Sequence, residues 1–271
     1  MGKFVEVQFD DLTAHDAEML IAVLNEAGFE GFEEAVATLK AFIPASQFDE
    51  SVFLKLMEPF PMRFSIEMID DRNWNQVWES NFEPVVVDDF VGLRADFHSP
   101  ISGVMHEIVI TPKMSFGTGH HATTHMMLQQ MRQIDFRDKS VFDFGTGTGV
   151  LAILASKLGA VSILAIDNDE WSIENAGENF VRNEVTNIQL VKSEEGDQHS
   201  TFDVILANIN MHIILENLPA LARQLKADGI LYLSGLLMED EADISKRAGA
   251  CGLKMRTQSQ KDNWLFMSMS H

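Results

Sequence analysis

A glycine-rich loop stands between a predicted strand and a predicted helix in the second half of the chain. The strand is the apolar run Ser140–Phe144, and the helix covers Val150–Leu158. Between them, Gly145, Gly147 and Gly149 let the backbone turn tightly and lie close to a ligand. Loops of this kind bind different classes of nucleotide-containing ligand. The glycines therefore predict a binding site but do not identify its ligand.

Two carboxylates narrow the choice of ligand. Asp143 comes just before the loop, where it repels a pyrophosphate and attracts the cationic sulfonium and amino group of S-adenosylmethionine. The loop spacing is also Gly-x-Gly-x-Gly, which differs from the dinucleotide-binding pattern. Asp167 ends the next strand, where an acid accepts hydrogen bonds from ribose hydroxyls. Asp169 is interpreted as a helix cap. Together these residues favour S-adenosylmethionine over a nicotinamide dinucleotide.

Asn208 is the candidate catalytic residue. It follows the predicted strand Phe202–Ala207, and ligands of open α/β sheets bind beyond the carboxyl ends of strands. Its side-chain carbonyl can accept a hydrogen bond from an amine and so orient that amine. Asparagine is also a common turn former, but the nearby glycine loop and strand-end acid favour a site here.

The segment upstream of the glycine strand is rich in glycine, threonine and histidine. We expect it to close over the cofactor, with Phe116, Thr123 and Thr124 among the candidate cofactor contacts. His121 and His125 are four residues apart on a predicted helix, a spacing that can bind zinc. Since no carboxylate or cysteine pattern completes the ligand set, we predict no metal site.

Residues 84–271 are predicted to form an α/β domain that positions these side chains. Short apolar strands alternate with helices, which is typical of a mostly parallel sheet covered on both faces. Leu253–Thr257 and Trp264–Met269 flank a polar turn and predict a terminal antiparallel hairpin. This layout is that of a Rossmann-like class I methyltransferase domain.

Residues 1–70 are predicted to form a separate, small α+β domain. Strand and helix patterns follow in the order strand, helix, strand, strand, helix, strand, which indicates a ferredoxin-like fold. A charged patch begins at Asp70, and a linker is predicted over residues 71–83. Trp74 and Trp78, at helical spacing, are interpreted as packing residues of this linker.

Composition limits the classes of partner and location. The 271 residues carry a net charge of −21 and one cysteine, Cys251. Such acidity argues against direct nucleic-acid binding and suits a basic protein partner, although acidity also serves solubility alone. A single cysteine cannot form an internal disulfide, and no apolar run is long enough to span a bilayer. We therefore expect a cytoplasmic protein without a membrane segment.

Several of these motifs together resemble the ribosomal protein L eleven methyltransferase family. The resemblance covers most of residues 74–271. It rests on the following segments: Phe116–His120 with Thr123 and Thr124, Asp143–Gly149, Ile166–Asp169, Ala207–Ile209 and Leu233–Gly235.

The resemblance implies more than the spacing does. It implies S-adenosylmethionine as cofactor, with contacts at Thr124, Gly145, Asp167 and Asn208. It also implies methylation of lysine side chains and the terminal amine of a basic ribosomal protein of the large subunit, which the small domain recognises. The modified lysines, the degree of methylation, the proton acceptor, the oligomeric state and whether free protein or ribosome is the substrate stay open.

Three alternatives remain at this point. The first is a methyltransferase acting on another protein or on a small molecule. The second is a nicotinamide-dependent oxidoreductase, which would use Asp167 and the glycine loop in the same way. The third is a non-catalytic relative that binds protein, although an intact glycine loop with Asp167 and Asn208 argues against it.

Overall fold

A computed structural model describes the chain except at residues 1–3, 14–15, 17–19, 22, 25–26, 30, 36, 58, 61, 70–81 and 113–116. The chain forms two compact units, Met1–Ser80 and Asn81–His271. The linker predicted at 71–83 lies almost wholly outside the described residues, so its extent stays a prediction, as do the domain limits at 70 and 84. Among the described helices, none has the length and apolar character needed to cross a bilayer.

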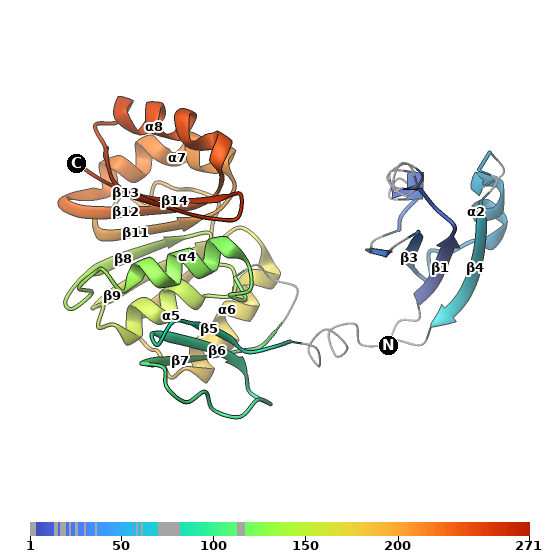
Figure 1. Ribbon diagram of the computed structural model, residues 1–271, viewed down its shortest axis with the longest axis horizontal. Helices are drawn as coiled ribbons and strands as arrows, with labels where there is room; N and C mark the ends of the chain where they lie inside the picture. The colour runs from blue at the N-terminus through green and yellow to red at the C-terminus, as the bar shows by residue number, and fades with distance from the viewer. Residues whose placement is uncertain are drawn as a thin grey trace. The chain divides into compact units, whose positions relative to one another are not determined.

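The N-terminal unit is an antiparallel sheet with the strand order β2-β3-β1-β4 (Figure 1). Burial alternates along its strand β1, so Val5, Val7 and Phe9 are buried in the core. Thr13 and Asp16 exchange backbone-to-side-chain hydrogen bonds in the manner of a capping box. The order and connectivity are ferredoxin-like. The described elements are β1 (Phe4–Asp10), β2 (Gly31–Ala35), β3 (Thr38–Pro44), α2 (Glu50–Met57) and β4 (Arg63–Ile69).

The second unit is built on a seven-stranded sheet with the order β10-β9-β8-β11-β12-β14-β13. Neighbours from β10 to β12 run parallel, and β14 runs antiparallel to both β12 and β13. This arrangement confirms the Rossmann-like sheet with a terminal hairpin. The strands are β8 (Ser140–Phe144), β9 (Ser162–Asp167), β10 (Ile188–Lys192), β11 (Phe202–Asn208), β12 (Leu225–Leu237), β13 (Lys254–Lys261) and β14 (Trp264–Ser270).

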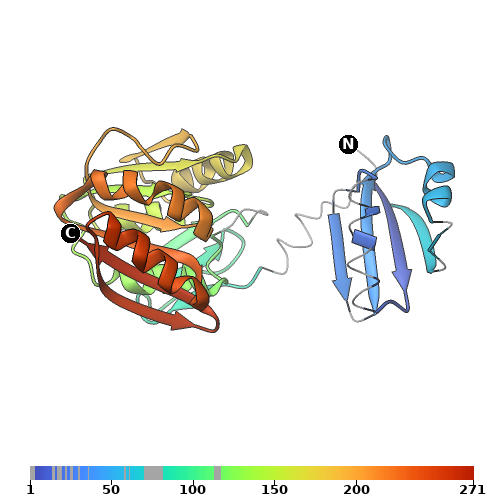
Figure 2. The ribbon, with the colours of Figure 1, turned by 90° about the horizontal axis from the view of Figure 1, so that it is seen from above.

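Helices cover both faces of this sheet (Figures 1 and 2). One apolar core unites α4, α5 and α6 with one face, and a second unites α7 and α8 with the other. Because both faces are covered, every side chain from Val141 to Phe144 in β8 is buried. The helices are α4 (Ala122–Met131), α5 (Val150–Lys157), α6 (Glu170–Arg182), α7 (Met211–Gln224) and α8 (Glu241–Ala250).

A second, three-stranded sheet precedes α4, and the sequence patterns did not predict it. Its order is β5-β6-β7, with β5 antiparallel and β7 parallel to β6. The side chain of Asn183, the residue that follows α6, binds β7: the Val109 N–H donates to Asn183 Oδ1, and Asn183 Nδ2 donates back to the Val109 carbonyl. The strands are β5 (Val85–Val87), β6 (Val91–Ala95) and β7 (His106–Ile110).

Candidate active site

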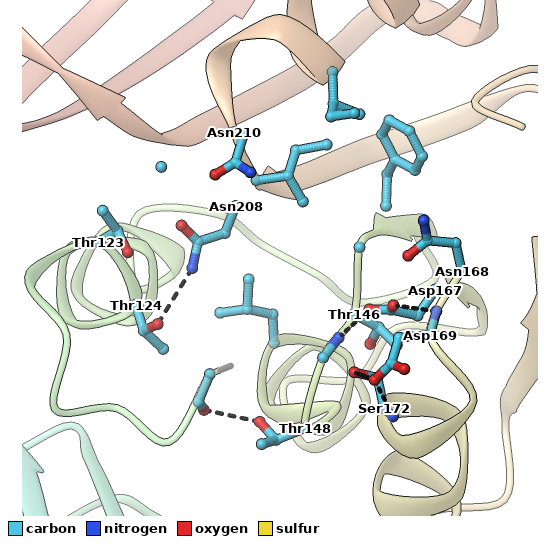
Figure 3. A pocket seen from close by; sticks show the side chains of 18 of the residues that line it. Thr123, Thr124, Thr146, Thr148, Asp167, Asn168, Asp169, Ser172, Asn208 and Asn210 are labelled. Carbon is cyan, nitrogen blue, oxygen red and sulfur yellow. Dashed lines mark hydrogen bonds between the residues drawn. The ribbon is translucent and has the colours of Figure 1, made fainter. Parts of the chain in front are cut away.

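A cavity of about 840 Å³ lies at the carboxyl ends of β8, β9 and β11 (Figure 3). This size falls within the range of small-molecule and cofactor sites. Figure 3 shows two groups of polar side chains around it: Thr123, Thr124 and Asn208 on one side, and Asp167 and Asp169 on the other. The parallel strands end at this edge, which explains why residues distant in the sequence meet here.

The glycine loop forms the floor of the cavity. Gly145 has a φ of +77°, and a Cβ atom there would lie 2.2 Å from Ile209 Cγ2, so only glycine fits. The amides of Gly145 and Thr146 both donate to the Ile166 carbonyl, at 3.0 and 2.8 Å. These bonds tie the loop to the end of β9 and leave backbone facing the cavity.

Asp167 is held by the backbone of two loops. Its Oδ2 accepts a hydrogen bond from the Gly147 N–H at 2.9 Å, and its Oδ1 accepts from the Asp169 N–H at 3.0 Å. The carboxylate is therefore oriented before any ligand arrives, and it lines the cavity. Its contact with ribose hydroxyls stays a prediction. Asp169 Oδ2 accepts from the Ser172 N–H at 3.0 Å, which confirms Asp169 as the cap of α6.

Asp143 lies beneath the loop and is not part of the cavity wall. Its side chain is completely buried, and its Oδ2 accepts a hydrogen bond from the Thr146 hydroxyl at 2.6 Å. Burial, joined by the charge of Asp167, raises the pKa of Asp143 to about 7 against the lowering effect of Thr146. Its charge is thus partly suppressed at neutral pH, which weakens the argument that Asp143 selects the cofactor by charge. A direct cofactor contact at Asp143 stays a prediction.

Asn208 and Thr124 meet at the opposite side of the cavity. The Asn208 Nδ2 donates to the Thr124 hydroxyl at 3.2 Å. Asn208 Oδ1 is buried and has no hydrogen-bond partner among the residues that the structure describes. A buried carbonyl oxygen without a partner is costly, so the site is prepared for a donor from a ligand.

Other predicted site residues fall around this pair. Thr123 and Thr124 belong to the first turn of α4, are buried and line the cavity. His121 caps α4, and its Nδ1 lies 2.7 Å from the Thr123 hydroxyl. Phe116 lies outside the described residues. The described residues hold no group of three histidine, cysteine or acidic side chains arranged for a metal ion.

Sequence reasoning missed several lining residues. Glu194 and Glu195 follow β10, Glu216 lies on α7, and Trp264 begins β14. The glutamates carry no local motif. The sequence pattern assigns Trp264 only to a strand, and the register of that strand with β12 brings its side chain to the cavity. The position of Glu194 just beyond β10 could have indicated a lining residue, because the carboxyl end of β10 lies at the same edge of the sheet as Asp167.

Comparisons with known proteins agree with this geometry. The family of ribosomal protein L11 methyltransferase (PrmA) matches residues 6–271. A ribosomal protein L11 methyltransferase of Porphyromonas gingivalis is 40% identical over 267 residues, which cover 94% of this chain and 91% of the relative. One from Chlorobaculum parvum is 40% identical over 261 residues, 92% of this chain and 90% of the relative.

A solved structure shares the fold of a large part of the chain. The crystal structure of ribosomal protein L11 methylase from Lactobacillus delbrueckii subsp. bulgaricus superposes with a TM-score of 0.65 at 28% identity. It covers 70% of this chain and 98% of that one. Because the family match spans nearly the whole chain and the alignments cover about nine-tenths of each relative, the chain belongs to the ribosomal protein L11 methyltransferase family.

Proposed function

We propose that this protein transfers methyl groups from S-adenosylmethionine to lysine side-chain and terminal amines of ribosomal protein L11. The observation that carries the proposal is the buried, unpartnered Oδ1 of Asn208 at the wall of a cavity whose opposite side bears carboxylates. The relatives' names point to the same substrate, and the family supports the methyl donor.

The residues present fit this cofactor. Gly145 and Gly147 offer a close backbone approach, and Asp167 offers carboxylate oxygens to ribose hydroxyls. Thr123 and Thr124 add hydroxyl groups across the cavity. The bound cofactor supplies an electrophilic methyl group attached to a sulfonium. A nicotinamide cofactor would use Asp167 equally well, but membership in a methyltransferase family favours the sulfonium.

Asn208 orients the acceptor amine. Its Nδ2 is engaged with Thr124, which fixes the amide so that Oδ1 is free to accept an N–H from the substrate. A neutral amide aligns the amine without favouring its protonated form, whereas a carboxylate would raise the amine's pKa. An amine held in line with the methyl group reacts faster, because binding has already fixed the relative position of the two reactants.

The N-terminal unit is assigned the recognition of the ribosomal protein. It is compact and separate from the catalytic unit, and the chain's net charge of −21 attracts a basic substrate at long range. The same acidity opposes direct contact with ribosomal RNA.

The proposal is tested with purified enzyme, isotopically labelled S-adenosylmethionine and ribosomes that lack the methylation. Label is expected on ribosomal protein L11, and mass spectrometry of its peptides identifies the modified amines. Label on a different protein would support the methyl transfer and contradict the assignment of ribosomal protein L11 as the substrate. Saturable NADH binding without binding of S-adenosylmethionine, measured by calorimetry, would refute the cofactor assignment.

A further inference from the structure

The cavity has two chemically different ends. Its carboxylates gather over β9 and β10: Asp167 ends β9 and Asp169 follows it, and Glu194 and Glu195 follow β10. Glu216 adjoins Asn217, whose Oδ1 accepts a hydrogen bond from the Gly196 N–H on the same side. We call this region the acidic end.

The other end lies over β11, β12 and β14. Among the described residues that line it, Thr123, Thr124, Asn208, His121 and Trp264 provide hydroxyl, amide and aromatic groups and no carboxylate. We call this region the neutral end. Asn208 Oδ1, the oxygen without a partner, belongs to it.

Trp264 reaches the neutral end through strand register. It begins β14 and pairs with Leu237, the last residue of β12. Since β14 is antiparallel to β12, its first residue lies at the edge where the parallel strands end. Trp264 is half-buried and packs partly against the core, and it lines the cavity as well.

His121 fixes the orientation of the tryptophan ring. The two ring centroids are 4.5 Å apart at an interplanar angle of 70°, an edge-to-face contact. His121 is itself tied to α4 through Thr123. A chain of contacts therefore leads from Trp264 through His121 and the first turn of α4 to Thr124 and Asn208.

Aromatic groups suit an amine that must lose its proton before it reacts. A free lysine amine has a pKa of about 10.4, and a carboxylate beside it would hold the charged form. An aromatic face attracts an alkylammonium group more weakly, by cation–π interaction, and also packs against its aliphatic stem. It can hold the acceptor without preventing deprotonation.

We propose that Trp264, supported by His121, is the specificity-determining wall that holds the alkylammonium head and aliphatic stem of the acceptor at the neutral end beside Asn208. The inference rests on the proposed function, because it takes the acceptor to be an amine. It assigns the cofactor to the acidic end and predicts that Trp264 contributes to acceptor use and not to cofactor affinity.

The test uses the full-length protein with three variants. Trp264→Leu keeps an apolar side chain and removes the aromatic face, whereas Trp264→Phe keeps an aromatic face. Trp171→Leu is the matched control, because Trp171 is 72% exposed on α6 and does not line the cavity. Kd for S-adenosylmethionine is measured by calorimetry, and kcat/KM is measured with unmethylated ribosomal protein L11 at saturating cofactor.

We expect Trp264→Leu to lower kcat/KM about tenfold, within the range of a cation–π contact. Trp264→Phe should keep most of the activity, Trp171→Leu should match the wild type, and all should bind the cofactor with unchanged Kd. A second readout is competitive inhibition by Nα-acetyl-trimethyllysine amide compared with its neutral tert-butyl isostere. The wild type should prefer the cationic inhibitor, and Trp264→Leu should lose that preference.

The outcomes separate the inference from the function beneath it. If the wild-type enzyme methylates the protein and Trp264→Leu is equally active, the role proposed for Trp264 is wrong and the proposed function stands. The same holds if the wild type methylates the protein but prefers neither inhibitor. If Trp264→Leu loses cofactor binding while Trp264→Phe retains it, Trp264 serves the cofactor and the inference is overturned. If wild-type enzyme binds the cofactor but methylates no amine, the proposed function fails and the inference fails with it.

Discussion

Replacing Asp143 with asparagine should make the protein more stable, and increasingly so as the pH rises. Asp143 is completely buried beneath the glycine loop. Asparagine has the same shape, and its side-chain oxygen can still accept the hydrogen bond that Thr146 donates. The variant therefore removes an ionisable group while keeping its contact.

The magnitude follows from the pKa of Asp143, which burial raises from 3.8 to about 7. The folded state then holds a proton that the unfolded state has released, so stability falls with pH between these two values and levels off above the folded pKa. The full cost is about 4 kcal/mol, at 1.36 kcal/mol for each pKa unit. Between about pH 5.5 and pH 8.5, the stability advantage of Asp143→Asn should grow by roughly 2 kcal/mol.

Urea unfolding of the wild type and of Asp143→Asn, monitored by circular dichroism at several pH values in this range, measures the difference in their free energies of unfolding. Asp203→Asn is the matched control. Burial alone would raise the pKa of Asp203, but hydrogen bonds from Lys226 and Ser140 outweigh it and lower that pKa to about 2. Asp203 is therefore fully ionised throughout the tested pH range, and the stability it contributes does not change with pH. Asp203→Asn should be destabilised by the same amount at every pH. A pH-independent difference for Asp143→Asn would show that Asp143 is ionised throughout and refute the reasoning.

Three further predictions concern the cavity and the N-terminal unit. Asp167→Ala should weaken S-adenosylmethionine binding by about 1–3 kcal/mol, the value of hydrogen bonds to a charged group; an unchanged calorimetric Kd would leave Asp167 only a structural role. Asn208→Ala should lower kcat more than cofactor affinity, and Asn208→Asp should also be slow because it favours the protonated amine; near-normal turnover in both would make Asn208 a turn residue. Removing residues 1–80 should preserve cofactor binding and abolish methylation of intact ribosomal protein L11, and full activity of the shortened enzyme would remove the recognition role.

Most of the large sheet could be predicted because its strands are apolar runs bounded by glycines and caps. The limits predicted for β8 agree with the structure, and the helix predicted at Val150–Leu158 is α5, which ends one residue earlier at Lys157. The small sheet escaped prediction because β5 has only three residues, Arg94 interrupts the apolar residues of β6, and β7 begins with the polar pair His106 and Glu107.

The site was predictable where chain order alone fixes position. Asp167 and Asn208 end parallel strands and so had to meet at one edge. The direction of Asp143 could not be predicted, because β8 is buried on both faces and its pattern does not show which side a residue faces. The position of Trp264 also required the register of an antiparallel pair, which turn residues alone do not specify.

The insertion of β14 between β12 and β13 has a consequence for synthesis of the chain. During translation, β12 emerges with one edge unpaired, and that edge stays open until β14, made later than β13, takes its place. An unpaired strand of 13 residues is a template for pairing with other chains, so chaperone protection of the nascent protein would matter most in this interval. Because Trp264 arrives with the same strand, the cavity reaches its final form only when this closing step is complete. The catalytic unit would thus become competent only after β14 has been synthesised and has paired with β12 and β13.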